Sequence, residues 1–434
     1  MNTFRYYYLS GIITFFAVLL IAAPVPATTH YVVPINPAAA DPYTNWSTAG
    51  TSIIDVVNCA ITGSAPRIVL VSNGVYVLTN QVTISSTVTV QSVNGRDVTI
   101  IDGNNQRRCV RLSAGSVLKG FTVRNGYTND YGGGIRCNNS YVQNCRITAN
   151  VCSNYWGGGI CVGSSTISNC EVVANTNINS LAGGVYAEGN SLVVSCVIAS
   201  NVVTNTAGGE ARAGGMHAED DTAVIDKCII HDNLVLSSGY AYGGGVELTK
   251  GAVVRNSFIY SNRAKTGGGI FVYFSRGSIQ NCTVVSNFAD NGGGIATICQ
   301  NAYTTYVENV ISYFNIGGSH SNFYMYRPGW HESTGSYYVV NNCIASTNEF
   351  STDASVAAGY YYANNIETDP RFENKDSNDF HVTLNSPCLN AGTNASWMSG
   401  TADLDGHSRI DRFSGIVDMG CYEYIPSGMK FDIR

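Results

Sequence analysis

GGGIRCNNSYVQNCRITANVCSNYWGGGI, residues 132–160, begins and ends with the same four residues. Between them, Cys145 and Asn150 lie five positions apart. The same pair, with the Cys sometimes replaced, recurs at Cys170/Asn175, Cys196/Asn201, Cys228/Asn233, Ser257/Asn262, Cys282/Asn287, Val310/Asn315 and Cys343/Asn348, after a weaker copy at Gly120/Asn125. Glycine triplets or their variants begin at 132, 157, 182, 213, 243, 267 and 292. A fixed period of about 25 residues indicates a solenoid.

Each repeat contains two or three short strand patterns and no helical pattern. The sequence therefore predicts an all-β fold, a parallel β-helix in which one repeat forms one turn. A single turn cannot bury its apolar face alone, so stability must come from stacking. We expect the repeated Asn to adopt the left-handed conformation at one corner and to bond the next Asn through its amide. The glycines are expected to form the other corner.

The repeated cysteines are expected in the core. In Cys145-Arg146-Ile147 the alternation of a strand sends Cys and Ile to one face and Arg to the other. There is no C-x-x-C pair, which argues against a metal site at these positions. Cys388 and Cys421 lie outside the repeat and are the first choice for a disulfide, with free thiols as the alternative.

Composition limits the partners and the location. The 434 residues are 44% hydrophobic and 12% charged, with a net charge of −6 and no basic patch, which excludes nucleic acid as an expected partner. Residues 1–27 contain Arg5, an apolar run from Gly11 to Ala23 and a small-residue cleavage site ending at Ala27. They read as a secretory signal peptide, with a membrane anchor as the alternative, and the run is shorter than the ~20 residues of a spanning helix. We expect a secreted or cell-surface protein with no membrane span after cleavage.

The segment before the repeats predicts a cap. Apolar residues from Ile53 to Ile61 have helical spacing, with Ser52 or Thr51 as N-cap and Gly63 as the stop, and this helix is expected to cover an open end of the core. Strands are expected near Tyr31–Val33 and at Arg67–Val71, Val82–Ser85, Val88–Gln91 and Val98–Ile101. We divide the chain into a signal peptide (1–27), an N-terminal cap with the first turns (28–120), the β-helix repeats (121–350) and a C-terminal capping region (351–434).

Two resemblances follow from these motifs. The GGGI…Asn-Cys repeats resemble the right-handed parallel β-helix of pectin-lyase-like proteins. The C-terminal motifs DPRF (369–372), DFH (379–381), SPCLNAG (386–392), DLDG (403–406) and VDMGCYE (417–423) together resemble the choice-of-anchor Q domain. That resemblance implies a domain placed before a sorting or anchoring signal. The sequence ends at Arg434 without one, so release is expected.

Aligned repeats place polar residues in two outward-facing columns. The first column holds Arg136, Cys161, Tyr186, His217, Glu247 and Phe271, and the second Asn138, Gly163, Glu188, Glu219, Thr249 and Tyr273. Neighbours within a column are expected about 4.8 Å apart. The segments 201–213 and 233–243, just before these strands, are longer than in other repeats, and such insertions often border a binding site.

These columns contain the candidate site. Glu188, His217, Glu219 and Glu247 are the candidate catalytic residues. Close carboxylates raise each other's pKa, a His can act as acid or base, and two carboxylates about 5 Å apart suit retaining glycoside hydrolysis. The candidate substrate-binding residues are Tyr186, Arg212, Phe271 and Tyr273. The alternative is a solvated face of ordinary polar residues.

No metal is assigned, and calcium is a candidate cofactor. Glu188, Glu219 and Glu247 could supply oxygen ligands, with Lys250 or Arg212 as a nearby base. A second candidate is Asp403-Leu404-Asp405-Gly406, where a simple Asp-Gly turn is favoured.

Residues 303–362 hold many aromatics, among them Tyr303, Tyr306, Phe323, Tyr324, Tyr326, Trp330, Tyr337 and Tyr338. They predict a cap over the far end of the core, with a sugar-binding platform as the alternative.

The sequence thus predicts an exported right-handed β-helix that binds carbohydrate, or acts in adhesion, along the solenoid surface. The expected partner is an extracellular or cell-surface polysaccharide. The alternative is a polysaccharide lyase or glycoside hydrolase that uses the Glu/His cluster. The glycan, the oligomeric state and the choice between enzyme and binding protein stay open at this stage.

Overall fold

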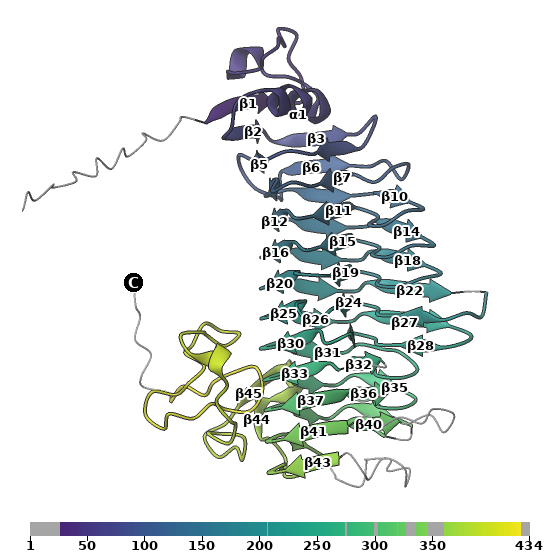
Figure 1. The fold of residues 1–434 in the computed structure, drawn as a ribbon, viewed down its shortest axis with the longest axis vertical. Coiled ribbons are helices and arrows are strands. Elements are labelled where there is room, and N and C mark those ends of the chain that lie inside the picture. Colours follow the sequence, from purple (N-terminus) through teal and green to yellow (C-terminus); the bar gives the residue numbers. More distant parts are fainter. Residues whose placement is uncertain are drawn as a thin grey trace, which may run out of the picture.

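The computed structural model describes residues 27–205, 207–273, 276–298, 303–318, 320–326, 336–345 and 360–426. These residues form a right-handed parallel β-helix of about 10 turns, as predicted (Figure 1). The expected signal peptide lies outside the described residues, apart from Ala27. No helix in the described ranges has the length and apolar character needed to cross a membrane.

Three long parallel sheets run the length of the solenoid. Sheet A contains β1 (Thr28–Val32), β2 (Arg67–Val71), β5 (Val88–Ser92), β8 (Val117–Lys119), β12 (Tyr141–Gln143), β16 (Thr166–Ser168), β20 (Leu192–Val194), β25 (Val224–Asp226), β30 (Val253–Arg255), β33 (Ser278–Gln280), β37 (Thr304–Glu308), β41 (Ser336–Val340) and β43 (Tyr360–Ala363). Sheet B contains β3 (Gly74–Val77), β6 (Thr99–Asp102), β9 (Thr122–Arg124), β13 (Arg146–Thr148), β17 (Glu171–Val173), β21 (Val197–Ala199), β26 (Ile229–His231), β31 (Phe258–Tyr260), β34 (Thr283–Val285), β38 (Ile311–Tyr313) and β42 (Cys343–Ile344). Sheet C contains β4 (Val82–Ile84), β7 (Val110–Leu112), β11 (Ile135–Asn138), β15 (Ile160–Gly163), β19 (Val185–Glu188), β24 (Met216–Glu219), β29 (Val246–Thr249), β32 (Ile270–Tyr273), β36 (Ile295–Ile298) and β40 (Phe323–Tyr326).

Shorter sheets project from one side of the solenoid. Sheet D contains β10 (Tyr127–Thr128), β14 (Val151–Ser153), β18 (Thr176–Ile178), β22 (Val202–Asn205) and β27 (Leu234–Ser237). Two further parallel pairs are β23 (Ala211–Arg212) with β28 (Ala241–Tyr242), and β35 (Phe288–Ala289) with β39 (Ile316–Gly317). Several middle turns therefore have four strands, and the two that contain β23 and β28 have five, more than the sequence predicted, because the segment after the Asn corner also pairs with its neighbours.

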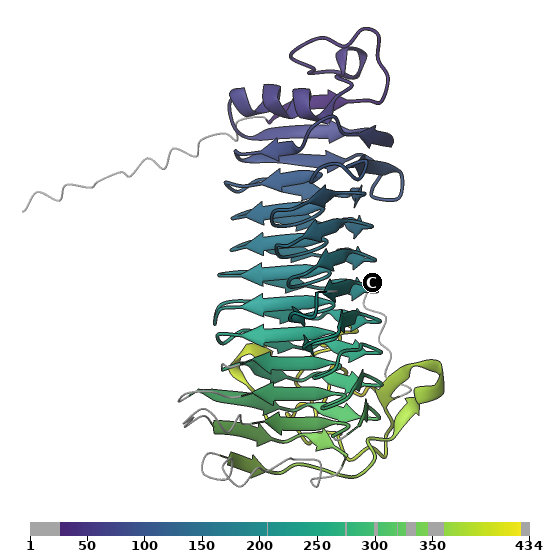
Figure 2. The same ribbon diagram turned by 90° about the vertical axis from the view of Figure 1, so that its right-hand side faces the viewer.

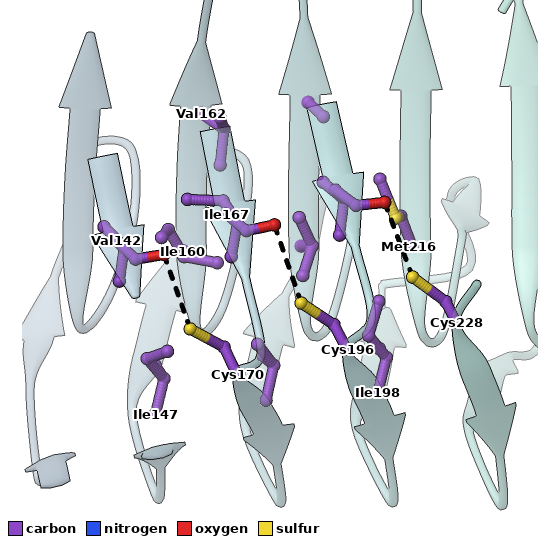
Figure 3. Close-up of a cluster of buried hydrophobic side chains, with 14 of the residues drawn as sticks. Val142, Ile147, Ile160, Val162, Ile167, Cys170, Cys196, Ile198, Met216 and Cys228 are labelled. Carbon is purple, nitrogen blue, oxygen red and sulfur yellow. Dashed lines mark hydrogen bonds between the residues drawn. The ribbon is translucent and has the colours of Figure 1, made fainter. Parts of the chain in front are cut away.

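The core contains the alternate residues of each strand, as the Cys-x-Ile pattern predicted. Cys145 and Ile147 are fully buried. Figure 3 shows the stacked cysteines of successive turns, in which the thiols of Cys170 and Cys196 donate to the carbonyl oxygens of Val142 and Ile167. The cysteines behave as small core residues whose weak S–H donors are satisfied by the backbone.

The expected disulfide between Cys388 and Cys421 is wrong, because every cysteine in the described ranges is a free thiol. Cys421 packs with Phe258 and Phe380, whereas Cys388 packs with Cys343 in a separate apolar cluster. The two thiols that the prediction paired therefore sit in different clusters.

The repeated asparagines form a buried ladder, as predicted. The side-chain amide of Asn150 donates to the Oδ1 atom of Asn175 at 2.9 Å, and Asn175 donates to Asn201 at 3.0 Å. Their expected left-handed conformation is found at Asn125 (φ 53°) but is wrong for Asn150 and Asn175, where it belongs to the preceding residues Ala149 (φ 54°) and Ala174 (φ 54°). The preceding residue turns the chain, which leaves the Asn free to point inward.

The glycine corner combines two requirements. Gly157 has a φ of +77°, the left-handed conformation predicted for this corner. Gly158 has an ordinary φ, but a Cβ there would lie 2.3 Å from the carbonyl oxygen of Gly183 in the next turn. The first glycine therefore serves the turn, and the second allows neighbouring turns to approach.

The N-terminal helix covers one end of the core, as expected (Figure 2). Helix α1 (Ile53–Thr62) begins after Ser52, whose hydroxyl accepts the backbone N–H of Asp55 at 3.3 Å, and ends at Gly63. Its residues Ile53, Val56, Val57 and Ala60 are buried in the core cluster. A short 3-10 helix (Trp46–Thr48) precedes it.

The C-terminal region lies on the side of the solenoid, not over its end as expected (Figure 1). The solenoid also continues past residue 350, because β43 belongs to sheet A. The hairpin β44 (Phe372–Asn374) and β45 (Asp379–Val382), two 3-10 turns (Lys375–Ser377 and Ser396–Met398) and long loops pack on the outer face of sheet B. The amide of Asn309 donates to the carbonyl of Thr393, and the hydroxyl of Thr283 accepts the N–H of Cys421.

An ion-paired histidine joins two parts of this region and predicts a pH dependence. The ring of His381 contacts Asp405 at 2.8 Å and Asp379 at 2.6 Å, and it packs on Tyr422. The bond to Asp405 raises the pKa of His381 to about 9, although burial opposes it. Because the pKa of His381 is higher in the folded protein than in the unfolded chain, where it is about 6.5, protonated His381 stabilises the fold. This stabilisation is complete below about pH 6.5 and is lost as the pH rises through about 9.

We therefore expect His381→Gln to lower the urea midpoint at pH 6, and the gap to the unchanged protein to be smaller at pH 10. Urea unfolding followed by circular dichroism at both pH values measures the difference. A gap between the two proteins that is the same at both pH values would contradict the prediction.

Candidate functional site

The two predicted columns exist and are in register along sheet C. Successive partners in the first column are Arg136, Cys161, Tyr186, His217, Glu247 and Phe271. In the second column Asn138, Gly163, Glu188, Glu219 and Thr249 pair in the same way. The repeat alignment therefore predicted which residues are neighbours.

The first column is not on the surface, which corrects the expected surface cluster. Glu247 and Phe271 have no exposed area, and Tyr186 and His217 are 1% and 3% exposed. The segment before each glycine corner folds over this column. Trp156 stacks on Tyr186 at 4.5 Å, and Tyr242 stacks on Phe271 at 4.7 Å. Tyr186 and Phe271, predicted to bind substrate, are therefore covered by other rings.

The buried part of the cluster is an ion network centred on Glu247. Its carboxylate accepts hydrogen bonds from Arg212, which is 11% exposed, and lies 3.1 Å from the Nδ1 atom of His217. Burial alone would raise the pKa of Glu247, but the charges of Arg212 and His217 outweigh it and lower the pKa. Burial lowers the pKa of His217, and the two carboxylates of Glu247 and Glu219 more than compensate. Glu247 thus lies between the guanidinium of Arg212 and the ring of His217.

The partly exposed part of the cluster is organised by Tyr186. Its hydroxyl donates to Glu219 at 2.6 Å and lies 3.4 Å from Glu188. Glu219 also contacts His217 at 3.6 Å and pairs with Lys250. The contact with His217 lowers the pKa of Glu219, whereas burial and the charge of Glu219 raise the pKa of Glu188. The predicted mutual rise is therefore found for Glu188 and is reversed for Glu219 and Glu247.

The two candidate calcium sites do not fit these contacts. The carboxylate oxygens of Glu247 are taken by Arg212 and His217, and Lys250 lies against Glu219. The carboxylate of Asp403 accepts hydrogen bonds from the backbone N–H groups of Asp405, His407 and Glu423. This agrees with the simple Asp-Gly turn that the sequence favoured. In the described part of the chain, no group of three or more His, Cys, Asp or Glu side chains is arranged to hold a metal ion.

An aromatic pocket, which the sequence reasoning missed, lies beside the ion network. It has a volume of about 360 Å³ and is lined by Gly239, Tyr240, Ala241, Tyr242, Lys265, Thr266, Asp290, Asn291, Ile298 and Tyr324. Tyr240 is 67% exposed and stacks parallel to Tyr242 at 5.9 Å. Tyr273 links the pocket to the network, because its ring lies 3.6 Å from the Arg212 guanidinium and 6.4 Å from Tyr242.

Near the pocket, the first column has a small residue between two rings. Phe271 pairs with Ala296, and Ala296 pairs with Tyr324, so a methyl group stands between two aromatic side chains. Tyr240 and Tyr242 come from the long segment 233–243, which the sequence marked as a border of a binding site. The sequence does contain a signal for this pocket, namely Tyr240 and Tyr242 two positions apart before a glycine corner. Alternate residues of an extended segment share a face, so two rings on one face could have been predicted.

Two groups stand out among the other aromatics of residues 303–362. Tyr337 and Phe323 are buried in the core. Tyr306, Tyr338 and Tyr361 are in register on the outer face of sheet A, with rings 5.7 and 5.0 Å apart. Trp330 lies outside the described residues. In the described part these rings are built into the turns, so they do not form the separate cap that was expected.

Comparison with solved structures agrees with this fold. The pectate lyase Pel9A superposes with a TM-score of 0.50 at 13% identity, covering 92% of this chain and 98% of that chain. A catalytic domain of a GH87 alpha-1,3-glucanase in complex with nigerose gives 0.35 at 14% identity, covering 79% of this chain and 69% of that chain. A pectin methylesterase in complex with a hexasaccharide gives a TM-score of 0.28 at 12% identity, covering 76% of this chain and 95% of that chain.

The TM-scores of the glucanase and the pectin methylesterase are too low to support an argument. No family model matches the chain, and no curated protein matches it. The choice-of-anchor Q resemblance therefore stays a prediction. The likeness to Pel9A shows that the chain has the pectate-lyase-like right-handed parallel β-helix fold.

Proposed function

We propose that this protein binds a polysaccharide on the side of its solenoid, at the pocket lined by Tyr240, Tyr242 and Tyr324. The pocket is the observation that carries the proposal. Its aromatic lining offers apolar faces to sugar rings, and Lys265, Asp290 and Asn291 offer polar groups to hydroxyls. A long polymer could continue from this pocket along the neighbouring turns.

The ion network supports this pocket instead of contacting the sugar. Arg212 packs on Tyr273, which borders Tyr242, and Arg212 is held by the buried Glu247. The predicted substrate-binding role of Arg212 thus becomes one of support. Tyr273 is partly exposed and stays a candidate contact.

Alanine at the stacked tyrosines is expected to weaken polysaccharide binding by about tenfold for each ring, because buried or stacked Tyr contacts are frequent hot spots. Tyr240→Ala and Tyr242→Ala test the pocket, and affinity electrophoresis in polysaccharide gels gives the dissociation constants. Tyr141→Ala is the matched control, since Tyr141 is 45% exposed on sheet A. Tyr338→Ala tests the other aromatic surface, and loss of binding in this variant alone would overturn the pocket assignment.

A glycoside hydrolase is the second candidate, and one observation favours it. Glu188 and Glu219 both contact the hydroxyl of Tyr186, and their pKa values are shifted in opposite directions. Such a split suits a general acid and an ionised partner. Release of reducing ends that disappears in Glu219→Gln, while binding persists, would support hydrolysis. Binding without any release would leave the binding function alone.

We also propose that the protein acts outside the cytoplasm, in adhesion or surface attachment to the polysaccharide. The signal-peptide pattern of residues 1–27 and the choice-of-anchor Q resemblance of the C-terminal region support this. N-terminal sequencing of the protein recovered outside the cell should begin at Thr28. Full-length protein retained in the cytoplasm would contradict export.

A further inference from the structure

We propose that the pocket selects neutral sugars over uronic acids. This inference rests on the proposed polysaccharide binding and adds the chemical class of the ligand. It depends on where the charges beside Tyr240 and Tyr242 are and on which of them are already engaged.

Lys265 is the one cationic residue in the described lining of the pocket. Its ammonium group donates to the carbonyl oxygens of Ser238 at 2.9 Å and Gly239 at 2.7 Å. A lysine has three N–H donors, so two of them are used by the backbone. Lys265 thus holds the loop that carries Tyr240 and has little left to offer a sugar carboxylate.

The neighbouring arginines are also engaged. Arg212 is bound to Glu247, and its guanidinium lies over the ring of Tyr273. Arg263 lies over the ring of Phe288 at 4.6 Å. Recognition of a carboxylate usually relies on a guanidinium that presents two free N–H groups to it. Arg212 is committed to a buried carboxylate of its own, and Arg263 is absent from the lining.

Asp290 adds an opposing charge. Asp290 is an exposed residue of the pocket lining. A sugar carboxylate beside Asp290 would meet a like charge, which costs about 1 kcal/mol at 4 Å in water and more in a partly desolvated pocket. A sugar hydroxyl would instead donate to Asp290 in a charge-assisted hydrogen bond. Thr266 and Asn291 add neutral polar groups, so the lining as a whole matches an uncharged, hydroxyl-rich ring.

The test compares neutral and acidic polysaccharides of similar length. Mixed-linkage glucan, galactomannan and xylan form the neutral set, and polygalacturonate and alginate form the acidic set. We expect the full chain to bind at least one neutral polymer at least tenfold more tightly than either acidic polymer at 0.15 M salt. Asp290→Lys should narrow that ratio at least threefold by improving acidic binding. Glu373→Lys makes the same charge change on the exposed C-terminal hairpin and should leave the ratio unchanged.

The outcomes separate the two proposals. Tight binding of an acidic polymer would overturn the proposed selectivity for neutral sugars. If that binding were lost in Tyr240→Ala, the pocket would still be the polysaccharide-binding site. Neutral binding that is unchanged in both Tyr240→Ala and Tyr242→Ala would overturn the pocket as the selective site. Binding of none of the five polymers would overturn the proposed function itself. Tyr240 is 67% exposed, so its replacement should leave the urea midpoint unchanged and keep the test valid.

Discussion

Replacing Glu247 by Gln should lower the free energy of unfolding by about 3–5 kcal/mol. The carboxylate is fully buried and lies between Arg212 and the ring of His217. Its removal leaves the buried Arg212 guanidinium without its main counter-charge. Such a loss costs far more than breaking a surface pair, because the remaining charge has no water to solvate it. Urea unfolding followed by circular dichroism measures the change.

Two variants separate this effect from a general loss of charge. Glu210→Gln removes the other carboxylate near Arg212, at 3.8 Å and 43% exposed, and should change stability by less than about 1 kcal/mol. The double variant Arg212→Met with Glu247→Met removes both buried charges and should recover part of the loss. A loss under about 1 kcal/mol in Glu247→Gln would contradict the assignment of Glu247 as the anchor of the network.

The solenoid was predictable because its physics repeats at a fixed interval. Each repeat from residue 132 to residue 315 has a left-handed residue at the glycine corner and an inward amide at the Asn corner, so the sequence shows both at the same spacing. The same register predicted that Tyr186, His217 and Glu247 are successive neighbours, since one residue per turn must face its counterpart. Period alone therefore determined the neighbours within each column.

Burial of the first column was not predictable from that period. The rings that cover it, Trp156 and Tyr242, come from the segments before each glycine corner. The residue directly before each glycine corner is in register from turn to turn, but its type changes from Trp156 and Leu181 to Arg212, Tyr242 and Thr266, so the repeat does not show that this position covers the column. The pocket has a related origin, because Tyr240 and Tyr242 in its lining come from the long segment 233–243 and not from the aligned columns.

The directions of the pKa shifts at Glu219 and Glu247 were predicted wrongly for a related reason. The alignment of the internal repeats placed Glu188, Glu219 and Glu247 close together. This suggested either mutual repulsion of the carboxylates or a calcium site. Arg212 comes from β23 and Lys250 from the end of β29, and both approach from outside the aligned columns. Counter-charges that arrive from a covering segment change the pKa of a carboxylate as strongly as its neighbours within the sheet.

Asn201→Ala is expected to cost about 3–5 kcal/mol, through the hydrogen bonds of the Asn ladder. The side chain of Asn201 donates to Val172 at 2.8 Å and to Asn233 at 3.0 Å. Its Oδ1 atom accepts both the backbone N–H and the side-chain amide of Asn175 at 3.0 Å. All of these groups are buried, and each one left without a partner costs about 1–3 kcal/mol.

Asn179→Ala is the matched control in the neighbouring corner. Asn179 is exposed, and its left-handed φ of 65° favours Asn over Ala, so its replacement should cost about 1–2 kcal/mol, less than the loss at Asn201. Asn201→Asp keeps the shape but turns the donor into an acceptor that faces the oxygens of Val172 and Asn233. It should therefore destabilise at least as much as Asn201→Ala. If both Asn201 variants unfolded at the midpoint of Asn179→Ala, the ladder would contribute nothing, and the repeated Asn would need another cause than the bonding between turns.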